Sequence, residues 1–358
     1  MDAEAIVTTR AGDAIATLDD SVRLTAGTVE ILDRRVFPER VEWVSAHSAE
    51  EVADAIRDMV TQSSGPFYAA HAGLTLTAHQ VAGLPLDAAR ERMRQAGVAL
   101  GEARPTNAHP REAVDRVLTA IAPATSTAEL VEAAVSAGEA GLRHYADLSD
   151  ALARATVALL PDGARIMTHC WMDAYLFAIV RAADQAGRGY DWVVTETRPY
   201  LQGARLTAHS LRELGQRVTL ITDGMGAAAL SPGSTIGRID ALVTAADRVS
   251  LDGAVINKVG TLGLAIAAST FEVPYYALVQ EPDASAQSAA DIVVEQRRTD
   301  DVLETLGVRT ASPLVSEAWY PAFDVTPARF VTRIVTSRGD FAPERIRDYF
   351  APAQGGRA

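Results

Sequence analysis

Five short apolar stretches decide the fold: ARIMTHC (164–170), DWVVTET (191–197), RVTLITD (217–223), DALVTAAD (240–247) and PYYALVQ (274–280). Each is rich in the β-branched and aromatic residues that strands of a parallel sheet bury on both faces. Segments of helical period separate them, including LFAIVRAADQAG, GARLTAHSLRELG and GTLGLAIAAST. This alternation predicts an α/β domain with a Rossmann-like, doubly wound parallel sheet over residues 161–350.

The first part of the chain has a different pattern. Residues 20–45 alternate apolar and polar side chains between turn residues, which predicts a small antiparallel sheet. From Ser48 the period becomes helical, and Glu51 three residues later completes the spacing of a capping box. We therefore expect a domain with a small sheet and helices over 1–125, a linking helix over 126–160 and a disordered tail over 351–358.

Composition limits the classes of function. The chain has 358 residues, of which 48% are hydrophobic and 22% charged, as in ordinary globular proteins. Its formal net charge of −13 argues against nucleic acid or an anionic membrane as a partner. No apolar run reaches the roughly 20 residues that a bilayer span needs. The start lacks the layout of a signal peptide and the single cysteine forms no internal disulfide, so we expect a cytoplasmic protein.

Polar and reactive side chains follow several of the predicted strands. Cys170 ends the first stretch, Arg198 lies just beyond the second, and Asp247 ends the fourth. The carboxyl ends of parallel strands meet at one edge of a sheet, where open α/β folds bind ligands. We therefore expect these residues to share one site.

Cys170 and Asp247 are the candidate reactive groups. Cys170 precedes a helix that Asp173 is placed to cap, and a helix amino terminus favours the thiolate, so an acidic thiol is expected. Burial of Asp247 in a cleft would raise its pKa, which suits a general acid. The structural alternatives are a small buried hydrophobic residue at Cys170 and an ion pair between Asp247 and Arg248.

Lys258 is the only lysine among 33 basic residues. A compact ammonium is not interchangeable with a planar guanidinium, so its presence indicates a function, with chance survival as the alternative. We expect Asn257 and Lys258 to open a helix, and the turn 260–263 to bind phosphate through its backbone amides. Arg198 and Gln202, at another strand-to-helix turn, would add a guanidinium fork and an amide.

Two other classes of site have less support. The segment Gly224-Met225-Gly226-Ala227-Ala228-Ala229 fits the GxGxxA dinucleotide pattern, which would indicate an NAD-dependent oxidoreductase. However, it follows the third predicted strand rather than the first, and Ser231-Pro232-Gly233 interrupts the segment after it. The seven histidines show no HxH or HxxxH spacing, so we expect no metal and no organic cofactor.

The chain resembles the methylthioribose-1-phosphate isomerase family, which also contains ribose-1,5-bisphosphate isomerases and the regulatory subunits of the eukaryotic initiation factor 2B complex. The likeness runs from about Val22 to Ile346. It is strongest in RPTNAHPREAVDRV (104–117), MTHC (167–170), TETRPYLQGARLTAHSL (195–211), VTLITDGM (218–225), AADRVSLDGAVINKVGTLGLA (245–265) and YPAFDVTPARF (320–330).

This resemblance implies an aldose–ketose isomerase of the methionine salvage type that acts on a 1-phosphorylated pentose and forms a homodimer. It implies that Asp247 is the acid that assists ring opening and that Cys170 assists hydrogen transfer from C2 to C1. The family's substrate-binding positions fall on Arg104, Gln202, Asn257 and Lys258. Noncatalytic relatives generally lack the Cys–Asp pair, which counts against the alternative of a regulatory protein that binds a sugar phosphate or nucleotide.

Two segments depart from the family pattern. The stretch TQSSGPF (61–67) has no arginine where the isomerases carry RGAPAIG, and Ser63 and Ser64 are its candidate substrate-binding residues. After the cysteine, Trp171-Met172-Asp173 replaces a small Asn-Ala-Gly. Losing a guanidinium removes a bidentate clamp. We therefore expect methylthioribose 1-phosphate to be a poorer substrate than another pentose 1-phosphate that differs at C5.

Overall fold

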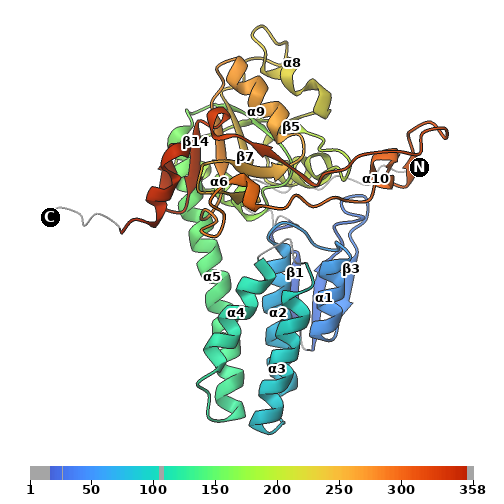
Figure 1. Cartoon of the computed structure of the whole chain (residues 1–358), viewed down its shortest axis with the longest axis vertical. Helices are drawn as coiled ribbons and strands as arrows, with labels where there is room; N and C mark the ends of the chain where they lie inside the picture. The colour runs from blue at the N-terminus through green and yellow to red at the C-terminus, as the bar shows by residue number, and fades with distance from the viewer. Residues whose placement is uncertain (1–16, 26, 105–108, 353–358) are drawn as a thin grey trace, which may run out of the picture. The chain divides into compact units, whose positions relative to one another are not determined.

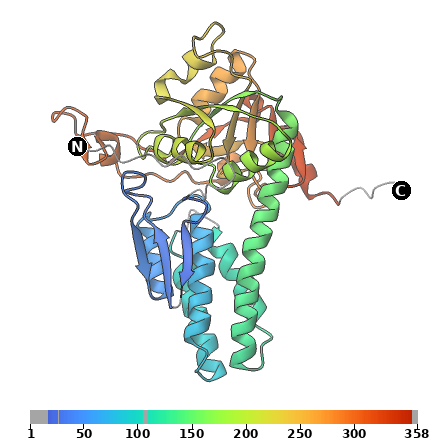
Figure 2. The ribbon, with the colours of Figure 1, turned by 180° about the vertical axis from the view of Figure 1, so that it is seen from behind.

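The computed structural model describes residues 17–25, 27–104 and 109–352. The chain divides into two compact units (Figures 1 and 2), of which the N-terminal unit comprises residues 20–151 and 173–175. The C-terminal unit comprises 152–172 and 176–352 together with 17–19. Most of the predicted tail, and residues 105–108 of the RPTNAHPREAVDRV motif, lie outside the described residues.

The N-terminal unit contains the predicted small antiparallel sheet. Strands β1 (Val22–Thr25), β2 (Thr28–Leu32) and β3 (Trp43–Ala46) pair in that order, with Ile31 opposite both Val22 and Val44. The helices that follow are α1 (Ala49–Arg57), α2 (Gly65–Gln80), α3 (Leu86–Gly101), α4 (His109–Ile121) and α5 (Thr127–Leu159), which runs into the C-terminal unit.

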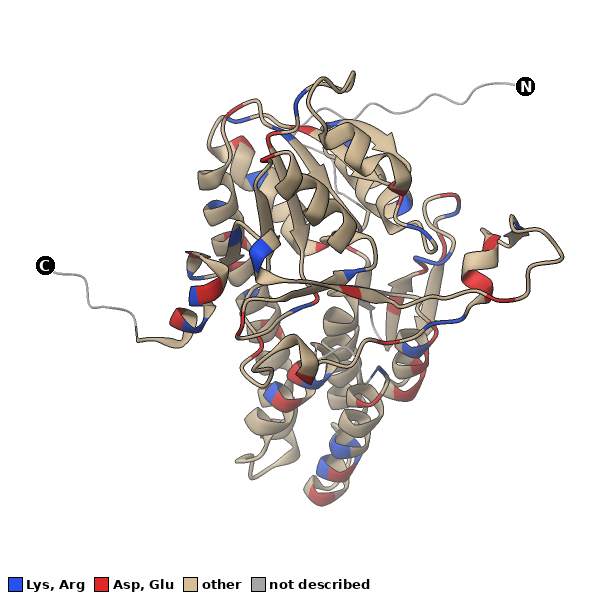
Figure 3. Cartoon of the chain, turned by 45° about the horizontal axis from the view of Figure 1, so that its top comes forward, with Lys and Arg blue, Asp and Glu red and all other residues tan. Residues whose placement is uncertain are grey.

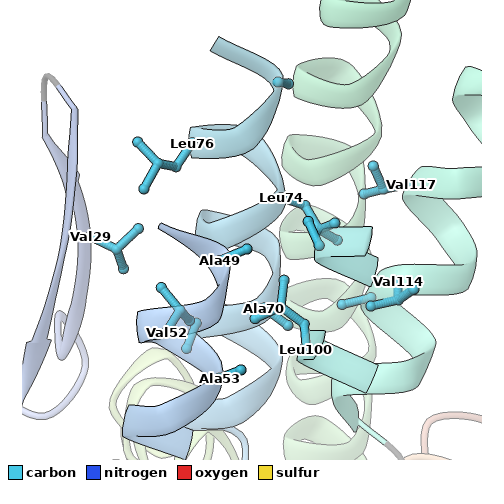
Figure 4. Packing of buried hydrophobic residues seen from close by; sticks show 14 of the residues in the cluster. Val29, Ala49, Val52, Ala53, Ala70, Leu74, Leu76, Leu100, Val114 and Val117 are labelled. Carbon is cyan, nitrogen blue, oxygen red and sulfur yellow. The ribbon is translucent and has the colours of Figure 1, made fainter. Parts of the chain in front are cut away.

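Helix α2 forms the centre of this unit because its apolar side chains point to every side. Leu74 on α2 packs with Leu100 and Val117, while Val29 of the sheet and Val52 of α1 belong to the same core (Figure 4). Acidic and basic residues are interspersed along the helices of this unit (Figure 3), and on α3 the exposed Arg94 and Glu91 form an ion pair at 2.6 Å. Such exposed pairs contribute at most about 1 kcal/mol.

The start of α1 confirms half of the predicted capping box. The backbone N–H of Glu51 donates to Ser48 Oγ at 3.1 Å. The Glu51 carboxylate accepts from the backbone N–H of His47 at 2.7 Å, one residue earlier than the box requires.

The C-terminal unit is built on a seven-stranded sheet. Its order is β15-β14-β10-β7-β4-β5-β6, and every neighbouring pair is parallel except β14 with β15. The strands are β4 (Arg165–Thr168), β5 (Asp191–Thr195), β6 (Arg217–Ile221), β7 (Ala241–Ala245), β10 (Tyr275–Leu278), β14 (Arg333–Thr336) and β15 (Gly339–Phe341). All five strands expected from the sequence are present, so the predicted doubly wound parallel sheet is confirmed.

The order of these strands creates one topological switch point. The chain adds β5 and β6 on one side of β4, then returns to place β7 on the other side. Open α/β sheets bind ligands outside the carboxyl ends of the strands at such a point. The helices of the unit are α6 (Ala174–Gln185), a π-helix (Gly203–Thr207) that continues into α7 (Ala208–Glu213), α8 (Gly226–Leu230), α9 (Thr261–Thr270) and α10 (Asp300–Leu303).

A second, antiparallel sheet corrects one expectation. Strands β8 (Arg248–Val249), β9 (Val255–Lys258) and β13 (Phe323–Thr326) pair in the order β13-β9-β8. Asn257 and Lys258 therefore end a strand instead of opening a helix, because pairing with β13 extends the apolar run Val255-Ile256 through them. A two-stranded hairpin, β11 (Glu304–Thr305) with β12 (Val308–Arg309), follows α10.

None of the described helices combines the length and the apolar character that crossing a membrane would demand.

Buried side chains of the central strands should contribute strongly to the free energy of unfolding. Trp192 on β5 has 1% of its surface exposed, whereas Trp319 has 77% exposed. Truncating Trp192 to alanine leaves a cavity, so Trp192→Ala should destabilise the protein by about 3–5 kcal/mol. Differential scanning calorimetry should record a clear fall in melting temperature, while the control Trp319→Ala leaves it nearly unchanged. Equal shifts for the two variants would contradict this assignment of the core.

Candidate active site

Cys170 and Asp247 lie at the switch point of the large sheet. Strands β4 and β7 are parallel neighbours, with Ile166 opposite Ala241. Cys170 lies two residues beyond the end of β4, and Asp247 lies two residues beyond the end of β7. The two strands therefore direct both residues to the same edge of the sheet, as expected from the sequence.

The backbone at Cys170 is held in an unusual conformation. Its φ is 68°, in the left-handed region that non-glycine residues rarely adopt. The Cys170 N–H donates to Thr197 Oγ1 at 2.9 Å, and the Thr207 hydroxyl donates to the Cys170 carbonyl. Both threonines are fully buried. Strained residues of this kind persist where the surroundings fix them, which is common at functional sites.

A π-helix supplies Thr207. It spans Gly203–Thr207, and π-helical turns often mark functional sites. Gly203 is required there because a Cβ atom would meet the Thr195 carbonyl oxygen at 1.8 Å. This close approach joins the π-helix to the end of β5.

The thiol of Cys170 is not acidic. Burial raises its pKa to about 11; the Lys258 ammonium opposes this rise, and the Asp247 carboxylate adds to it. The expectation of a thiolate stabilised by a helix amino terminus is therefore wrong, because the loss of solvent outweighs the nearby positive charges. The electrostatic influence of Lys258 and Asp247 on Cys170 also indicates that the three groups are neighbours.

Asp173 does not cap the helix after Cys170 as expected. It belongs to the N-terminal unit, where its carboxylate accepts from Arg34 Nη1 at 3.0 Å and from the Ser64 N–H at 3.2 Å. The Asp173 carboxylate thereby neutralises the buried Arg34 guanidinium, since an unpaired internal charge is costly.

Asp247 itself is exposed, so the burial expected of it is not found in the structure. Its backbone N–H donates to the Ile256 carbonyl at 2.9 Å, which ties it to the strand that carries Lys258. The alternative of an ion pair with Arg248 is wrong, because the Arg248 guanidinium binds the Asp283 carboxylate.

The His169 ring connects the end of β5 to the segment after β9. Its Nε2 lies 2.9 Å from the Val259 carbonyl and its Nδ1 lies 2.6 Å from Thr195 Oγ1. A carbonyl only accepts, so Nε2 carries the proton and Nδ1 accepts from the threonine. Burial lowers the pKa of His169, which favours this neutral ring. Gly260 is required beside it, since a Cβ atom there would meet the ring at 2.9 Å.

Lys258 and Asn257 are both buried at the end of β9. Lys258 Nζ donates to the Ala322 carbonyl at 3.1 Å and lies 4.6 Å from the centroid of the Phe323 ring. Asn257 Nδ2 donates to Thr261 Oγ1 at 3.0 Å. A buried position with one carbonyl and one ring suits a compact ammonium better than a guanidinium, which explains a lysine in an arginine-rich chain.

The predicted phosphate-binding turn is already occupied by a side chain. The Asp324 carboxylate accepts from the Gly260 N–H at 2.7 Å and from the Leu262 N–H at 3.1 Å. Asp324 lies opposite Asn257 in the β13–β9 pair, so strand register delivers its carboxylate to the start of α9. The expectation that these two amides bind phosphate is therefore wrong. Burial raises the pKa of Asp324 to about 6.

Arg198 has a different role from the predicted phosphate fork. Its guanidinium donates to the backbone carbonyls of Pro199 and Glu304, each at 3.0 Å, and of Val302 at 3.1 Å. Val302 lies in the last turn of α10, and a cation stabilises the carboxyl end of a helix. The guanidinium thus anchors the segment after β5 to that helix.

Gln202 keeps the character of a ligand-binding residue. It has 3% of its surface exposed, and its Oε1 atom has no hydrogen-bond partner within the described part of the chain. Buried polar atoms are nearly always paired in native proteins, so this oxygen is available to accept a hydrogen bond. A substrate hydroxyl would satisfy it.

Arg297 was not singled out by the sequence. Its backbone N–H donates to the Tyr320 carbonyl at 2.9 Å, and its Nε donates to Glu295 Oε1 at 3.2 Å. Its charge lowers the pKa of Cys170, so it lies in the same electrostatic environment as Lys258. No sequence motif indicates it, because backbone pairing of residues 295–297 with 320–322 brings this segment to the site.

Three predicted substrate residues belong to the N-terminal unit. Arg104 is partly buried, Ser63 has a φ of 57°, and the Ser64 N–H is bonded to Asp173. Their part in the site stays a prediction.

The alternative sites gain no support. The GxGxxA segment forms a 3₁₀ turn and the five-residue helix α8 after β6, at the edge of the sheet. A dinucleotide fingerprint belongs after the central first strand, which here is β4. Over residues 17–25, 27–104 and 109–352, no group of three or more His, Cys, Asp or Glu side chains is arranged to hold a metal ion.

Comparison with known proteins decides the family. The model of the Initiation factor 2 subunit family matches residues 45–343. The chain belongs to this family. The family expected from the sequence is thereby confirmed, and its members include proteins with different roles, as the relatives below illustrate.

Curated relatives in this family include two methylthioribose-1-phosphate isomerases. That of Anaeromyxobacter dehalogenans is 37% identical over 322 residues, which cover 87% of this chain and 90% of the relative. That of Pelotomaculum thermopropionicum is 34% identical over 337 residues, with 90% and 91% covered.

Two solved structures share the fold of most of the chain. 5-Methylthioribose 1-phosphate isomerase from Pyrococcus horikoshii superimposes with a TM-score of 0.83 at 28% identity and covers 92% of this chain and 94% of its own. The delta subunit of translation initiation factor eIF-2B from A. fulgidus has a TM-score of 0.80 at 29% identity and covers 91% and 96%.

The electrostatics of Cys170 predict its reactivity. With a pKa of about 11, only about 0.1% of the thiol is ionised at pH 8, so alkylation by iodoacetamide should be slow and should accelerate up to pH 10. Asp247→Asn should speed the reaction at a fixed pH, and Lys258→Met should slow it. Mass spectrometry of the single thiol measures the rate, with Cys170→Ser as the unlabelled control. If Asp247→Asn slowed the alkylation and Lys258→Met accelerated it, the three groups would not be neighbours.

The raised pKa of Asp324 predicts a pH dependence of stability. Because its pKa rises from 3.8 to about 6, folding favours the protonated form, and that contribution is lost as pH rises through 6. Asp324→Asn does not titrate, so it should gain stability relative to the wild type between pH 4 and 7, by at most about 3 kcal/mol. Calorimetry of both proteins across this range, with the exposed Asp348→Asn as a control, tests it. If the difference in stability between Asp324→Asn and the wild type did not change with pH, the raised pKa of Asp324 would be contradicted.

Proposed function

We propose that this protein converts a 1-phosphorylated aldopentose into the corresponding ketose 1-phosphate, with Asp247 as the acid and Cys170 assisting the hydrogen transfer. Its relatives make the chain a sugar-phosphate isomerase, as its sequence predicted. The observation that carries the finer proposal is the neighbourhood of Cys170, Asp247 and Lys258 at the switch point.

The first step follows from the chemistry of the substrate. A sugar phosphorylated at C1 is locked as a ring and has no free aldehyde. A proton from the Asp247 carboxyl to the ring oxygen lets the bond between C1 and that oxygen break. The exposed Asp247 is open to a substrate, and a sugar bound over it would exclude water and raise its pKa toward that of a useful acid.

The second step moves hydrogen from C2 to C1. In one route hydrogen moves with its electron pair from C2 to the electron-poor C1, while the C2 hydroxyl gives its proton to the Asp247 carboxylate left by the first step and becomes the ketone. In the other, a base removes the C2 proton. The high pKa of the Cys170 thiol makes it a poor base at neutral pH and so favours the first route. There the protonated thiol shields the reacting carbons from water.

The remaining residues bind the substrate. Lys258 supplies the cation for the phosphate, since Asp324 already occupies the amides at the start of α9. Asn257 lies beside it, and Gln202 Oε1 would accept a sugar hydroxyl. We further propose that Arg104, Ser63 and Ser64 contribute from the N-terminal unit, and that the protein is a cytoplasmic homodimer.

A noncatalytic regulator is the second candidate. The A. fulgidus structure, a subunit of a translation initiation factor, has much the same fold. The Cys170–Asp247 pair favours the isomerase. Incubation with a pentose 1-phosphate, followed by NMR for a new ketose carbonyl, distinguishes the two candidates.

The catalytic pair gives the decisive prediction. Cys170→Ser and Asp247→Asn should each fold normally and lose on the order of 10²-fold or more in kcat. Asp247→Asn removes the acid, and Cys170→Ser replaces the shielding thiol with a polar hydroxyl that attracts water to the reacting carbons. The substitution Asp348→Asn, in an exposed ion pair with Arg345, is a matched control and should retain full activity. Near-wild-type turnover by both active-site variants would exclude the mechanism.

A further inference from the structure

Two backbone segments of the C-terminal unit pair beside Lys258. The Arg297 N–H donates to the Tyr320 carbonyl at 2.9 Å, and the Ala322 N–H donates to the Glu295 carbonyl at 2.8 Å. These bonds flank an antiparallel bridge between the two segments. Because residues opposite each other in an antiparallel pair bring their side chains together, the pairing sets Arg297 against Tyr320.

The same backbone holds the Lys258 ammonium. The Ala322 carbonyl accepts from Lys258 Nζ at 3.1 Å and from the Val259 N–H at 3.2 Å. Ala322 is therefore bonded through its N–H to the segment that carries Arg297, and through its carbonyl to Lys258. Two cations that lie far apart in the sequence are thus attached to one short stretch of chain, residues 320–322.

The Arg297 guanidinium is held in a fixed orientation. Its Nε donates to Glu295 Oε1 at 3.2 Å, and the guanidinium also hydrogen-bonds the Tyr320 hydroxyl. The Arg297 side chain has 12% of its surface exposed and Tyr320 has 3%. A guanidinium carries several N–H donors in a rigid fork, so these contacts orient it and still leave donors on its terminal amino groups.

Both cations act on the thiol of Cys170. Burial is the main cause of the raised pKa of Cys170, and the charges of Lys258 and Arg297 oppose it. Burial likewise raises the pKa of Tyr320, the Arg297 charge lowers it, and the Cys170 thiolate adds to the rise. Charges act strongly only over short distances. Lys258, Arg297 and Tyr320 therefore surround the space next to Cys170.

A phosphate group is the ligand that suits this pair of cations. A guanidinium fork binds phosphate oxygens in a bidentate manner, and a compact ammonium adds a point charge. The Asp247 carboxylate also acts on Cys170, so it would repel an anion that no cation held in place. The backbone amides at the start of α9 already bind Asp324, which leaves this task to side chains.

We propose that Arg297 is a second phosphate-binding cation of the site, that it binds the 1-phosphate of the substrate together with Lys258, and that Glu295 and Tyr320 position it. This inference rests on the proposed function. Glu295 and Tyr320 act through the guanidinium and are positioning residues. Since the phosphate is attached to C1, binding it between these cations brings C1 next to Cys170.

Protection of Cys170 by inorganic phosphate tests the site without any substrate. With the ionic strength held constant by sodium chloride, phosphate should slow alkylation of the thiol by iodoacetamide in a saturable way. Arg297→Met should raise the phosphate concentration that gives half of this protection by on the order of tenfold. Without phosphate, Arg297→Met should already react more slowly than the wild type, because it loses a charge that lowers the pKa of Cys170.

Two further variants serve as controls. Arg345 lies in the same unit in an exposed ion pair with Asp348, so Arg345→Met should leave the protection unchanged. Arg297→Lys keeps the charge but loses the fork and should give protection between those of the wild type and Arg297→Met. If Arg297→Met fails to fold, weaker protection in Arg297→Lys provides the same test. Protection equal to that of the wild type in a folded Arg297 variant overturns the proposal.

Steady-state kinetics with a pentose 1-phosphate give the second measurement. Arg297→Met should raise KM by roughly tenfold and change kcat less, as expected when a binding contact is lost. Tyr320→Phe retains the cation and weakens only its orientation, so KM should rise by about threefold. A merely structural role for Arg297 would lower kcat and the melting temperature together and leave KM unchanged.

The two measurements separate the possible failures. A wild type that isomerises no pentose 1-phosphate would reject the proposed function, while phosphate protection would still decide whether Arg297 belongs to an anion site. Phosphate that fails to protect Cys170 of the wild type would reject the anion site even in an active isomerase.

Discussion

The parallel pairing of β4 with β7 is the constraint on which the site depends. The chain adds β5 and β6 on one side of β4 and then places β7 on its other side. The segments that follow β4 and β7 therefore flank the switch point, where open α/β sheets bind ligands. Cys170 follows β4 and Asp247 follows β7. The strand β9 then brings Lys258 to the same place through the bond from the Asp247 N–H to Ile256.

Protein carboxylates limit how the molecule binds anions. Asp324 occupies amides at the start of α9, and Asp173 occupies the amide at the start of α2. Both helices would otherwise be ordinary phosphate sites. Under the proposed function, phosphate recognition falls to a side-chain cation, for which we propose Lys258, buried near Cys170.

Burial sets the chemistry of Cys170. Two buried threonines fix its backbone, and the surrounding protein keeps its thiol protonated at neutral pH. A protonated, shielded thiol is suited to hydrogen transfer away from water, whereas a thiolate would be suited to nucleophilic attack. The exposed Asp247 beside it is open to the substrate that it is proposed to protonate. The two groups thus differ in solvation as well as in charge.

The sequence alone determined five parallel strands of the large sheet, the small antiparallel sheet of the N-terminal unit, the family, and the position of Cys170 and Asp247 after two of those strands. These features follow from periodicity and from motifs that are local in the chain. Only the tertiary structure decided that Arg198 binds carbonyls of a distant helix, that Asp324 fills the expected phosphate turn, that Asp173 pairs with Arg34 and that the thiol has a high pKa. Each of these four features depends on contacts with, or burial by, residues that are remote in the sequence. A local sequence pattern does not specify which remote residue will become the partner.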